Sequence, residues 1–222
     1  MSVHHHADIA VIIPTCRRPE GLERALDSVV AQIGVAAFHI VVVDNDPAGS
    51  ALSALAARRA RCPGLDLRIV HEPRPGVSNA RNAGLAATGA GLIAWLDDDQ
   101  EAPPGWLAAL LQAHVQLQAD VVFGPVRGHL PPGVSPHRRY FEGLYSRRGP
   151  SQTGPTPKTY GIGNALTRRA GLLDGPLPFD PAANDSGGED DILFARARAI
   201  GARFAWAADA EVTEHIDRGR AC

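Results

Sequence analysis

The sequence predicts an α/β fold in which one mostly parallel sheet is flanked by helices. First, short apolar runs of strand type alternate with segments of helical periodicity along the first half of the chain. Second, polar residues follow directly on some of these runs, as at Asp44 and Asp97. Third, 222 residues with 45% hydrophobic content and a net charge of -2 suit one globular domain. This composition argues against disorder and against a nucleic-acid partner, which usually selects a basic protein.

The elements of the first half follow one another in a regular order. The predicted strands are Ile9 to Ile13, Phe38 to Val43, Leu67 to Val70, Leu92 to Leu96 and Asp120 to Phe123. The predicted helices are Glu20 to Ala31, a segment capped by Ser50 that runs to about Arg61, Val77 to Ala87, and a segment that Pro103-Pro104 opens. Alternation of this kind predicts parallel strands joined by right-handed crossovers.

The second half has a weaker pattern. The segment from Gly128 to Pro157 is rich in Pro, Gly, Ser and Arg and has no sustained period, which predicts a functional or mobile loop. Order returns at Tyr160 to Thr167, and a helix is predicted from Glu189 to about Ile200. Two closing strands are expected at Ala202 to Trp206 and Ala210 to Thr213. Trp95 and Trp206 lie in apolar strands, so we expect them in the core.

Three adjacent carboxylates, Asp97-Asp98-Asp99, come directly after the apolar run Leu92 to Leu96. A strand that ends in this way places them at the carboxyl edge of the sheet, where open α/β folds bind ligands. Adjacent negative charges repel one another, so they persist best beside a cation, and oxygen ligands favour Mg²⁺ or Mn²⁺ over zinc. The alternative is a solvated acidic turn before the helix that starts near Pro104.

Other features limit the class of protein. No apolar stretch approaches the roughly 20 residues of a membrane span, so no integral span is expected. Residues 1–7 are interpreted as a tail, without the basic start and apolar middle of a signal peptide. Cys16, Cys62 and Cys222 are too few and too scattered for a zinc site or a disulfide framework, which favours a reducing, cytoplasmic compartment.

Six short motifs occur in an order and spacing that resemble a known family. They are Ile12-Ile13-Pro14-Thr15, Val42-Val43-Asp44-Asn45, Gly76-Val77-Ser78-Asn79-Ala80-Arg81-Asn82-Ala83-Gly84, Leu96-Asp97-Asp98-Asp99, Gly163-Asn164-Ala165 and Gly188-Glu189-Asp190-Asp191. The chain resembles family-2 glycosyltransferases of the GT-A fold from Ile9 to about His215. The resemblance implies a single Rossmann-like domain with a nucleotide-sugar-binding half at residues 8–126 and an acceptor-binding and catalytic-base half at residues 127–217.

The resemblance implies that a sugar passes from a nucleotide diphosphate donor to an acceptor hydroxyl, usually with inversion. Asp97 and Asp99 match the outer members of the family's Asp-x-Asp motif. Asp99 is then expected to face Mn²⁺ or Mg²⁺, and Asp97 to lean towards the ribose or sugar of the donor. Asp98 is expected to support the motif from beside the donor. His215 is a candidate second metal ligand, although a lone His is more often an ordinary packed or surface residue.

Three residues near the sheet edge are candidate donor contacts. Asp44 lies where the family hydrogen-bonds the nucleobase, and a carboxylate that accepts a ring N–H suits uracil or thymine. An Asx turn is a compatible structural role for Asp44. Thr15 belongs to the same donor-binding edge, where Cys16 replaces an aromatic residue that the family often has. Arg81 is expected to bridge to an aspartate of the triplet, as an organising residue, or to contact the donor.

The acceptor side contributes the candidate base. By resemblance Asp190 removes the acceptor proton, with Asp191 ranked second and Asn164 hydrogen-bonding a donor hydroxyl. Ser186 and Glu189 have the spacing of a capping box, which is a sufficient structural explanation for Glu189. Glu189 is also a candidate substrate-binding residue.

The long loop contains aromatic and basic residues that suit an acceptor. Tyr140, Phe141 and Tyr145 are candidate acceptor contacts, with loop packing as the alternative. The basic residues Arg138, Arg139, Arg147 and Arg148 suit an anionic acceptor or a lipid surface, with a solvated loop as the alternative. The expected partners are a nucleotide-sugar donor and a saccharide or lipid-linked saccharide acceptor, with possible peripheral membrane contact.

Two other functions fit parts of the pattern. A nucleotidyltransferase also places carboxylates and Mg²⁺ on an α/β sheet, but it usually has a Gly-rich loop after the first strand. Here that position holds residues 14–19, which contain no glycine. A non-catalytic nucleotide-sugar-binding domain is the second alternative, and it would not need Asp190.

Overall fold

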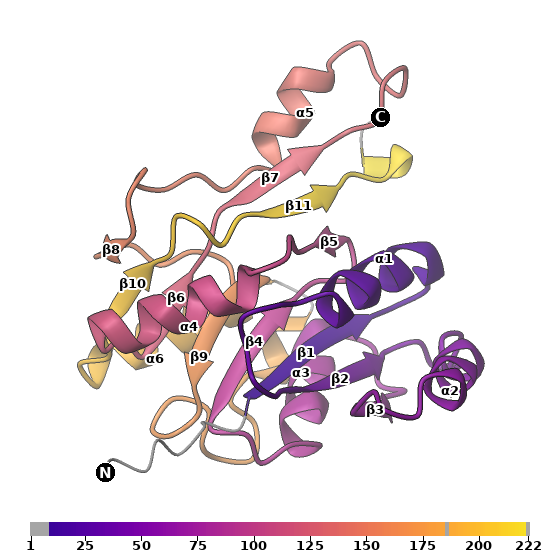
Figure 1. Ribbon diagram of the computed structural model, residues 1–222, viewed down its shortest axis with the longest axis horizontal. Coiled ribbons are helices and arrows are strands. Elements are labelled where there is room, and N and C mark those ends of the chain that lie inside the picture. Colours follow the sequence, from indigo (N-terminus) through magenta and orange to yellow (C-terminus); the bar gives the residue numbers. More distant parts are fainter. Residues whose placement is uncertain (1–8, 185–186, 221–222) are drawn as a thin grey trace.

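The computed structural model describes residues 9–184 and 187–220, and its centre is an eight-stranded sheet (Figure 1). The strands lie in the order β3 (Leu67–His71), β2 (His39–Asp44), β1 (Ile9–Thr15), β4 (Leu92–Leu96), β9 (Asn164–Arg168), β6 (Val121–Phe123), β10 (Phe204–Trp206) and β8 (Gly154–Pro155). The strands from β3 to β4 are parallel. β9 runs antiparallel to both neighbours, and β8 is antiparallel to β10. The prediction of a mostly parallel sheet in an α/β fold is confirmed.

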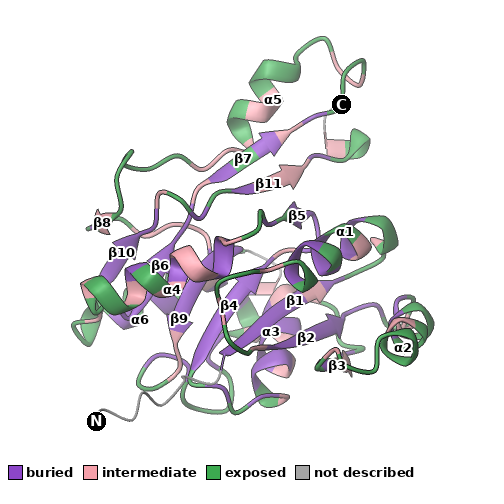
Figure 2. Ribbon diagram, in the orientation of Figure 1, coloured by how far each residue is buried: buried purple, intermediate pink, exposed green. Residues whose placement is uncertain are grey.

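Helices cover both faces of this sheet. The covering helices are α1 (Pro19–Val30), α2 (Leu52–Arg61), α3 (Val77–Ala86), α4 (Trp106–Leu117) and α6 (Glu189–Ala199), whereas α5 (Arg138–Leu144) buries no residue. Val11 and Ile13 of β1 pack in one core cluster with α1, α2 and α4, whereas Ile12 packs in the other with α3 and α6. Because successive strand residues point to opposite faces, a strand covered on both sides is apolar throughout. The central strands are accordingly buried along their length (Figure 2). Trp95 and Trp206 lie in this core, as predicted.

A second, three-stranded sheet adjoins the carboxyl edge of the first. Its order is β5 (Gln100–Glu101), β11 (Val212–His215) and β7 (Val126–His129), with β11 parallel to β7 and antiparallel to β5. β5 directly follows the acidic triplet, so this sheet brings the C-terminal part of the chain beside it. Figure 1 shows the sheet and α5 extending from one side of the main body.

The prediction of an irregular segment from Gly128 to Pro157 is wrong in part. The segment includes the end of β7, the whole of α5 and the short strand β8. No residue of α5 is buried. A helix without a buried face needs no apolar periodicity, which explains why the sequence pattern did not indicate one.

Several helix starts differ from the capping predicted from sequence. The N–H of Ala51, just before α2, is bound by the Asp44 carboxylate at 2.7 Å, so the cap does not come from Ser50. The first turn of α3 is capped by Asn184, whose Oδ1 accepts the Ser78 N–H at 2.9 Å. α6 begins at Glu189 after Gly188, which has a φ of 85°. Glu189 is therefore the first helical residue and cannot be the third residue of a capping box, while Ser186 lies outside the described residues.

Across residues 9–184 and 187–220, no helix has the length and apolar character that crossing a membrane requires.

Candidate active site

A cleft of about 700 Å³ lies at the carboxyl ends of β1, β2 and β4. The three aspartates of the triplet form part of its lining, together with Thr15, Asn45, Arg81 and Arg220. Carboxyl ends of parallel strands are the usual ligand site of open α/β sheets. The structure therefore brings the motifs after β1, β2 and β4 to one place, as the sequence predicted.

Asp98 anchors the triplet to the rest of the sheet. Its carboxylate accepts a hydrogen bond from the Thr15 hydroxyl at 2.7 Å and one from Arg18 Nη1 at 3.0 Å. Burial raises the pKa of Asp98, while the Thr15 hydrogen bond and the Arg18 charge oppose this rise. Both Asp98 and the Thr15 hydroxyl thus have internal partners, which supports a positioning role for each.

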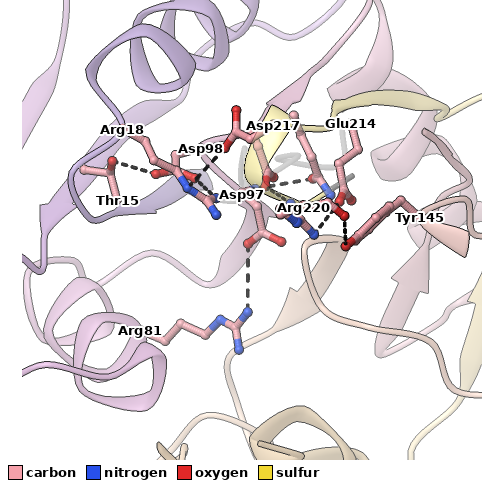
Figure 3. Close-up of polar contacts among 11 residues, drawn as sticks. Thr15, Arg18, Arg81, Asp97, Asp98, Tyr145, Glu214, Asp217 and Arg220 are labelled. Atoms are coloured by element: carbon pink, nitrogen blue, oxygen red, sulfur yellow. Dashed lines mark hydrogen bonds and ion pairs between the residues drawn. The ribbon is translucent and has the colours of Figure 1, made fainter. Parts of the chain in front are cut away.

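Asp99 lies between two guanidinium groups. Its Oδ2 accepts hydrogen bonds from Arg18 Nη1 at 2.9 Å and from Arg220 Nη1 at 2.8 Å. Burial raises the pKa of Asp99, and the neighbouring Asp98 charge adds to this rise. Figure 3 shows both arginines reaching the triplet. Neither arginine was predicted from sequence, because Arg220 joins the cleft only through the tertiary fold.

Asp97 points to the other side of the cleft, towards α3 (Figure 3). Its side chain is 37% exposed, against 11% for that of Asp99, so its carboxylate is the more accessible of the two. Asp97 Oδ1 lies 3.9 Å from Arg81 Nη2. A Cβ atom on Gly163 would lie 2.0 Å from Asp97 Oδ2, so a glycine at this position makes room for the carboxylate.

Arg81 joins two helices that meet at the cleft. It forms a buried ion pair with Glu189, the first residue of α6, and its guanidinium lies 5.5 Å from the centre of the Phe179 ring. With Asp97 on its other side, Arg81 bridges the triplet to α6, as one of the two predictions from sequence proposed. The explanation for Glu189 is this ion pair rather than a capping box.

Asp190 and Asp191 face different surroundings. Asp190 is half-buried, and its Oδ2 accepts the Ile162 N–H at 3.2 Å. Asp191 is exposed and lines a separate hollow with Thr159 and Phe194. Of the two candidates, only Asp190 therefore lies on the side of the acidic triplet, where its charge is felt by Asp97.

Arg147 lies near enough to the carboxylates of Asp97, Glu214 and Asp190 for their charges to act on it, and the sequence did not separate it from its basic neighbours. Its Nη1 donates to the Asn164 carbonyl at 3.4 Å, and burial lowers its pKa while the Asp97, Glu214 and Asp190 charges oppose this. Arg148, the next residue, is exposed. The fold thus separates the basic residues predicted on the loop: Arg147 lies near the carboxylates, whereas Arg148 is exposed.

Two predicted donor contacts have internal roles. Asn164 is fully buried, and its amide receives a hydrogen bond from Trp106 Nε1 and donates to the carbonyls of Pro125 and Ala210, each at 2.8 Å. Both N–H groups of the amide are therefore engaged, and neither is left to donate to a sugar hydroxyl. The geometry thus disagrees with the predicted sugar contact. Asp44 is also fully buried, and its carboxylate accepts the N–H groups of Asp46 and Ala51. This is the Asx-turn role, and nucleobase binding by Asp44 stays a prediction.

The side chain of His215 points away from the triplet. Its Nε2 contacts Glu101 at 2.9 Å on the outer side of β11. Because side chains alternate along a strand, the preceding residue, Glu214, faces the cleft instead. Burial and the charge of Asp99 raise the pKa of Glu214 to about 7. The His215 N–H donates to the Asp99 carbonyl at 2.8 Å, but the geometry gives no support to the His215 side chain as a metal ligand beside Asp99.

The cleft suits a divalent cation that a substrate helps to bind. Among residues 9–184 and 187–220, no group of three or more His, Cys, Asp or Glu side chains is arranged to hold a metal ion. Mg²⁺ usually takes one or two carboxylates together with substrate phosphates and water. Asp97 and Asp99 supply such carboxylates. The lining of the cleft includes the carboxylates of Asp97, Asp98 and Asp99 and the guanidiniums of Arg18, Arg81 and Arg220.

Comparison with known proteins agrees with this architecture. The chain is 34% identical over 225 residues to "Succinoglycan biosynthesis protein ExoM" of Rhizobium meliloti, an alignment that covers 97% of this chain and 69% of ExoM. Among solved structures, GalNAc-T7 with UDP, GalNAc and Mn²⁺ superposes with a TM-score of 0.74 at 16% identity, over 96% of this chain and 44% of that one. TarS of S. aureus with UDP superposes with a TM-score of 0.68 at 17% identity, over 95% and 61%.

The chain thus spans about half of the two solved structures, and their low identity supports the fold alone. The family model "Glycosyl transferase family 2" matches residues 10–174. These residues include the strands that end at the cleft and the acidic triplet. The chain belongs to glycosyl transferase family 2, and it is a glycosyltransferase with the GT-A fold.

Proposed function

We propose that the protein transfers a sugar from a UDP-linked donor to a hydroxyl of a saccharide or lipid-linked saccharide during exopolysaccharide assembly. The observation that carries the proposal is the cleft with the acidic triplet in its lining and with Asp190 near enough for its charge to act on Asp97. The name of ExoM supports a role in polysaccharide synthesis. The solved relatives that bind UDP, one of them with Mn²⁺, support the choice of donor and metal.

A divalent cation, Mn²⁺ or Mg²⁺, would neutralise the donor diphosphate and so make it a better leaving group. Asp99 would face this ion, whereas Asp97, which points to the other side of the cleft, would lean towards the ribose or sugar of the donor. Asp98 and Thr15 would hold the triplet in place. Arg81 would fix Asp97 relative to α6 through Glu189.

Asp190 would act as the base of a single displacement. The acceptor oxygen forms a bond to the anomeric carbon, the bond from that carbon to the diphosphate breaks, and the acceptor proton passes to the Asp190 carboxylate. Attack opposite the leaving group inverts the configuration. Asp190 lies in the first turn of α6 and has the guanidinium of Arg147 nearby.

We also propose a compartment and a membrane contact for the protein. Exposed, unpaired thiols at Cys16 and Cys62 support a reducing, cytoplasmic compartment. Arg139 and the 66% exposed Tyr140 on α5 support peripheral contact with a membrane that bears a lipid-linked acceptor.

A donor screen tests the proposed function. The protein would be incubated with Mn²⁺ and a panel of UDP-, dTDP- and GDP-sugars, followed by thermal shift and slow donor hydrolysis. We expect stabilisation and hydrolysis with a UDP-sugar. The proposal would be contradicted if no nucleotide sugar raised the melting temperature above that of the protein alone and none was hydrolysed.

A further inference from the structure

Arg220 reaches the cleft from the C-terminal side of the chain. It is the last residue of the 3-10 turn η2 (Arg218–Arg220), which follows β11. Its Nη1 lies 2.8 Å from Asp99 Oδ2, and its Nη2 lies 3.1 Å from Glu214 Oε1. Arg220 therefore neutralises the carboxylate to which the proposed function assigns the metal ion.

A second contact fixes the position of this guanidinium. The Arg220 Cζ lies 4.2 Å from the centre of the Tyr145 ring, which stands on the acceptor side after α5 (Figure 3). A cation over an aromatic face is attracted by the ring quadrupole. Tyr145 and Glu214 together would keep the guanidinium at the cleft even if its bond to Asp99 were lost.

A divalent ion on Asp99 would bring two further positive charges next to the Arg220 guanidinium. Repulsion between the ion and the guanidinium would weaken the bond from Nη1 to Asp99 Oδ2 and favour its release. Arg18 differs, because it also contacts Asp98 and keeps that partner. The released Nη1 would then need a new acceptor, and a diphosphate held by the ion presents one at the same place. A guanidinium is well suited to phosphate because its planar donors match the phosphate oxygens.

We propose that Arg220 is a donor-binding residue that exchanges partners. Without a donor it holds Asp99 and Glu214, and with metal and donor bound its Nη1 moves from Asp99 to the diphosphate. This inference rests on the proposed function, since it requires a divalent ion and a diphosphate in the cleft. Under this proposal, Arg220 weakens the binding of the ion alone and strengthens the binding of the nucleotide.

The opposite signs of these two effects allow a direct test. We would titrate Mn²⁺ alone, followed by electron paramagnetic resonance of the free ion, and then UDP at saturating Mn²⁺ by calorimetry. Arg220→Gln should bind Mn²⁺ alone more tightly and bind UDP with Mn²⁺ more weakly. Each change should be roughly tenfold, the size expected for one charge-assisted hydrogen bond. Arg218→Gln, an exposed arginine of the same turn, is the matched control and should change neither affinity.

A second variant separates charge from shape. Arg220→Lys keeps the positive charge but loses the planar fork, so Mn²⁺ affinity should stay near that of the unmodified protein while UDP affinity falls. Unchanged Mn²⁺ and UDP affinities in folded Arg220→Gln, as judged by its melting temperature, would overturn the role of Arg220 while leaving the proposed function standing. Failure of the unmodified protein to bind UDP would overturn both.

Discussion

The two sides of the cleft are built in different ways. The proposed donor side rests on β1, β2 and β4, which are buried on both faces and end together at one edge. The proposed acceptor side rests on the three-stranded sheet, on the start of α6 and on α5, a helix that buries no residue. A large core fixes the proposed donor side, whereas charged side chains from distant segments gather on the proposed acceptor side. We therefore expect rigid positions on the donor side and a group that can change partners, Arg220, on the acceptor side.

The largest expected effect tests the chemistry on the acceptor side. Asp190→Asn keeps the shape of the residue and its bond to the Ile162 N–H but removes its basicity. We expect kcat to fall by about 10²–10⁴-fold, the usual contribution of a general base, with little change in donor affinity. Kinetics with saturating donor would measure this.

Asp191→Asn is the matched control, because Asp191 is adjacent but lies outside the cleft. It should reduce kcat far less. Equal losses in both variants, in proportion to a lower melting temperature, would mean that these residues act only on the stability of the start of α6.

A second prediction tests whether a donor-side residue is structural. Asn164→Ala would leave Trp106 Nε1 and two backbone carbonyls without partners in the core. We expect the free energy of unfolding to fall by roughly 2–4 kcal/mol, since each unsatisfied buried group costs about 1–3 kcal/mol. Denaturant unfolding would measure the loss.

Asn79→Ala, which removes exposed hydrogen bonds to the Arg74 and Pro75 carbonyls, is the control and should cost little. If Asn164→Ala kept full stability and lost donor affinity instead, Asn164 would be a sugar contact, as the sequence first predicted.

A third prediction concerns the pH dependence of stability. The pKa of Glu214 is raised to about 7 in the folded protein, above its ordinary value of 4.5. The folded state then binds this proton more strongly than the unfolded state, so Glu214 favours folding at low pH and the benefit is lost as pH rises from about 4.5 to 7. The effect is at most about 3 kcal/mol.

The measurement is the melting temperature of the unmodified protein and of Glu214→Gln between pH 4 and 8. The unmodified protein should lose stability relative to the variant as pH rises through this window. Parallel curves would show that Glu214 has the same pKa in both states.

The same contrast explains what the sequence could predict. Continuous apolar strands and adjacent carboxylates are local signals, so the parallel strands up to β4 and the position of residues 97–99 followed from them. Arg18, Arg147 and Arg220 carry no local signal, because an arginine joins a site only when the fold brings it there. Asn164 matched a family motif, but its burial depends on Trp106, which lies far away in the sequence. His215 and Glu214 could have been separated only with the facing direction of β11 known.

The central claim is that a divalent ion on Asp99 binds the donor diphosphate at the donor side of the cleft. Calorimetry of UDP binding with and without Mn²⁺, in the unmodified protein and in Asp99→Ala, tests it most directly. We expect Mn²⁺ to strengthen UDP binding in the unmodified protein, and Asp99→Ala to remove that gain and abolish transfer while the protein stays folded. The same UDP affinity with and without Mn²⁺ in the unmodified protein would contradict the claim.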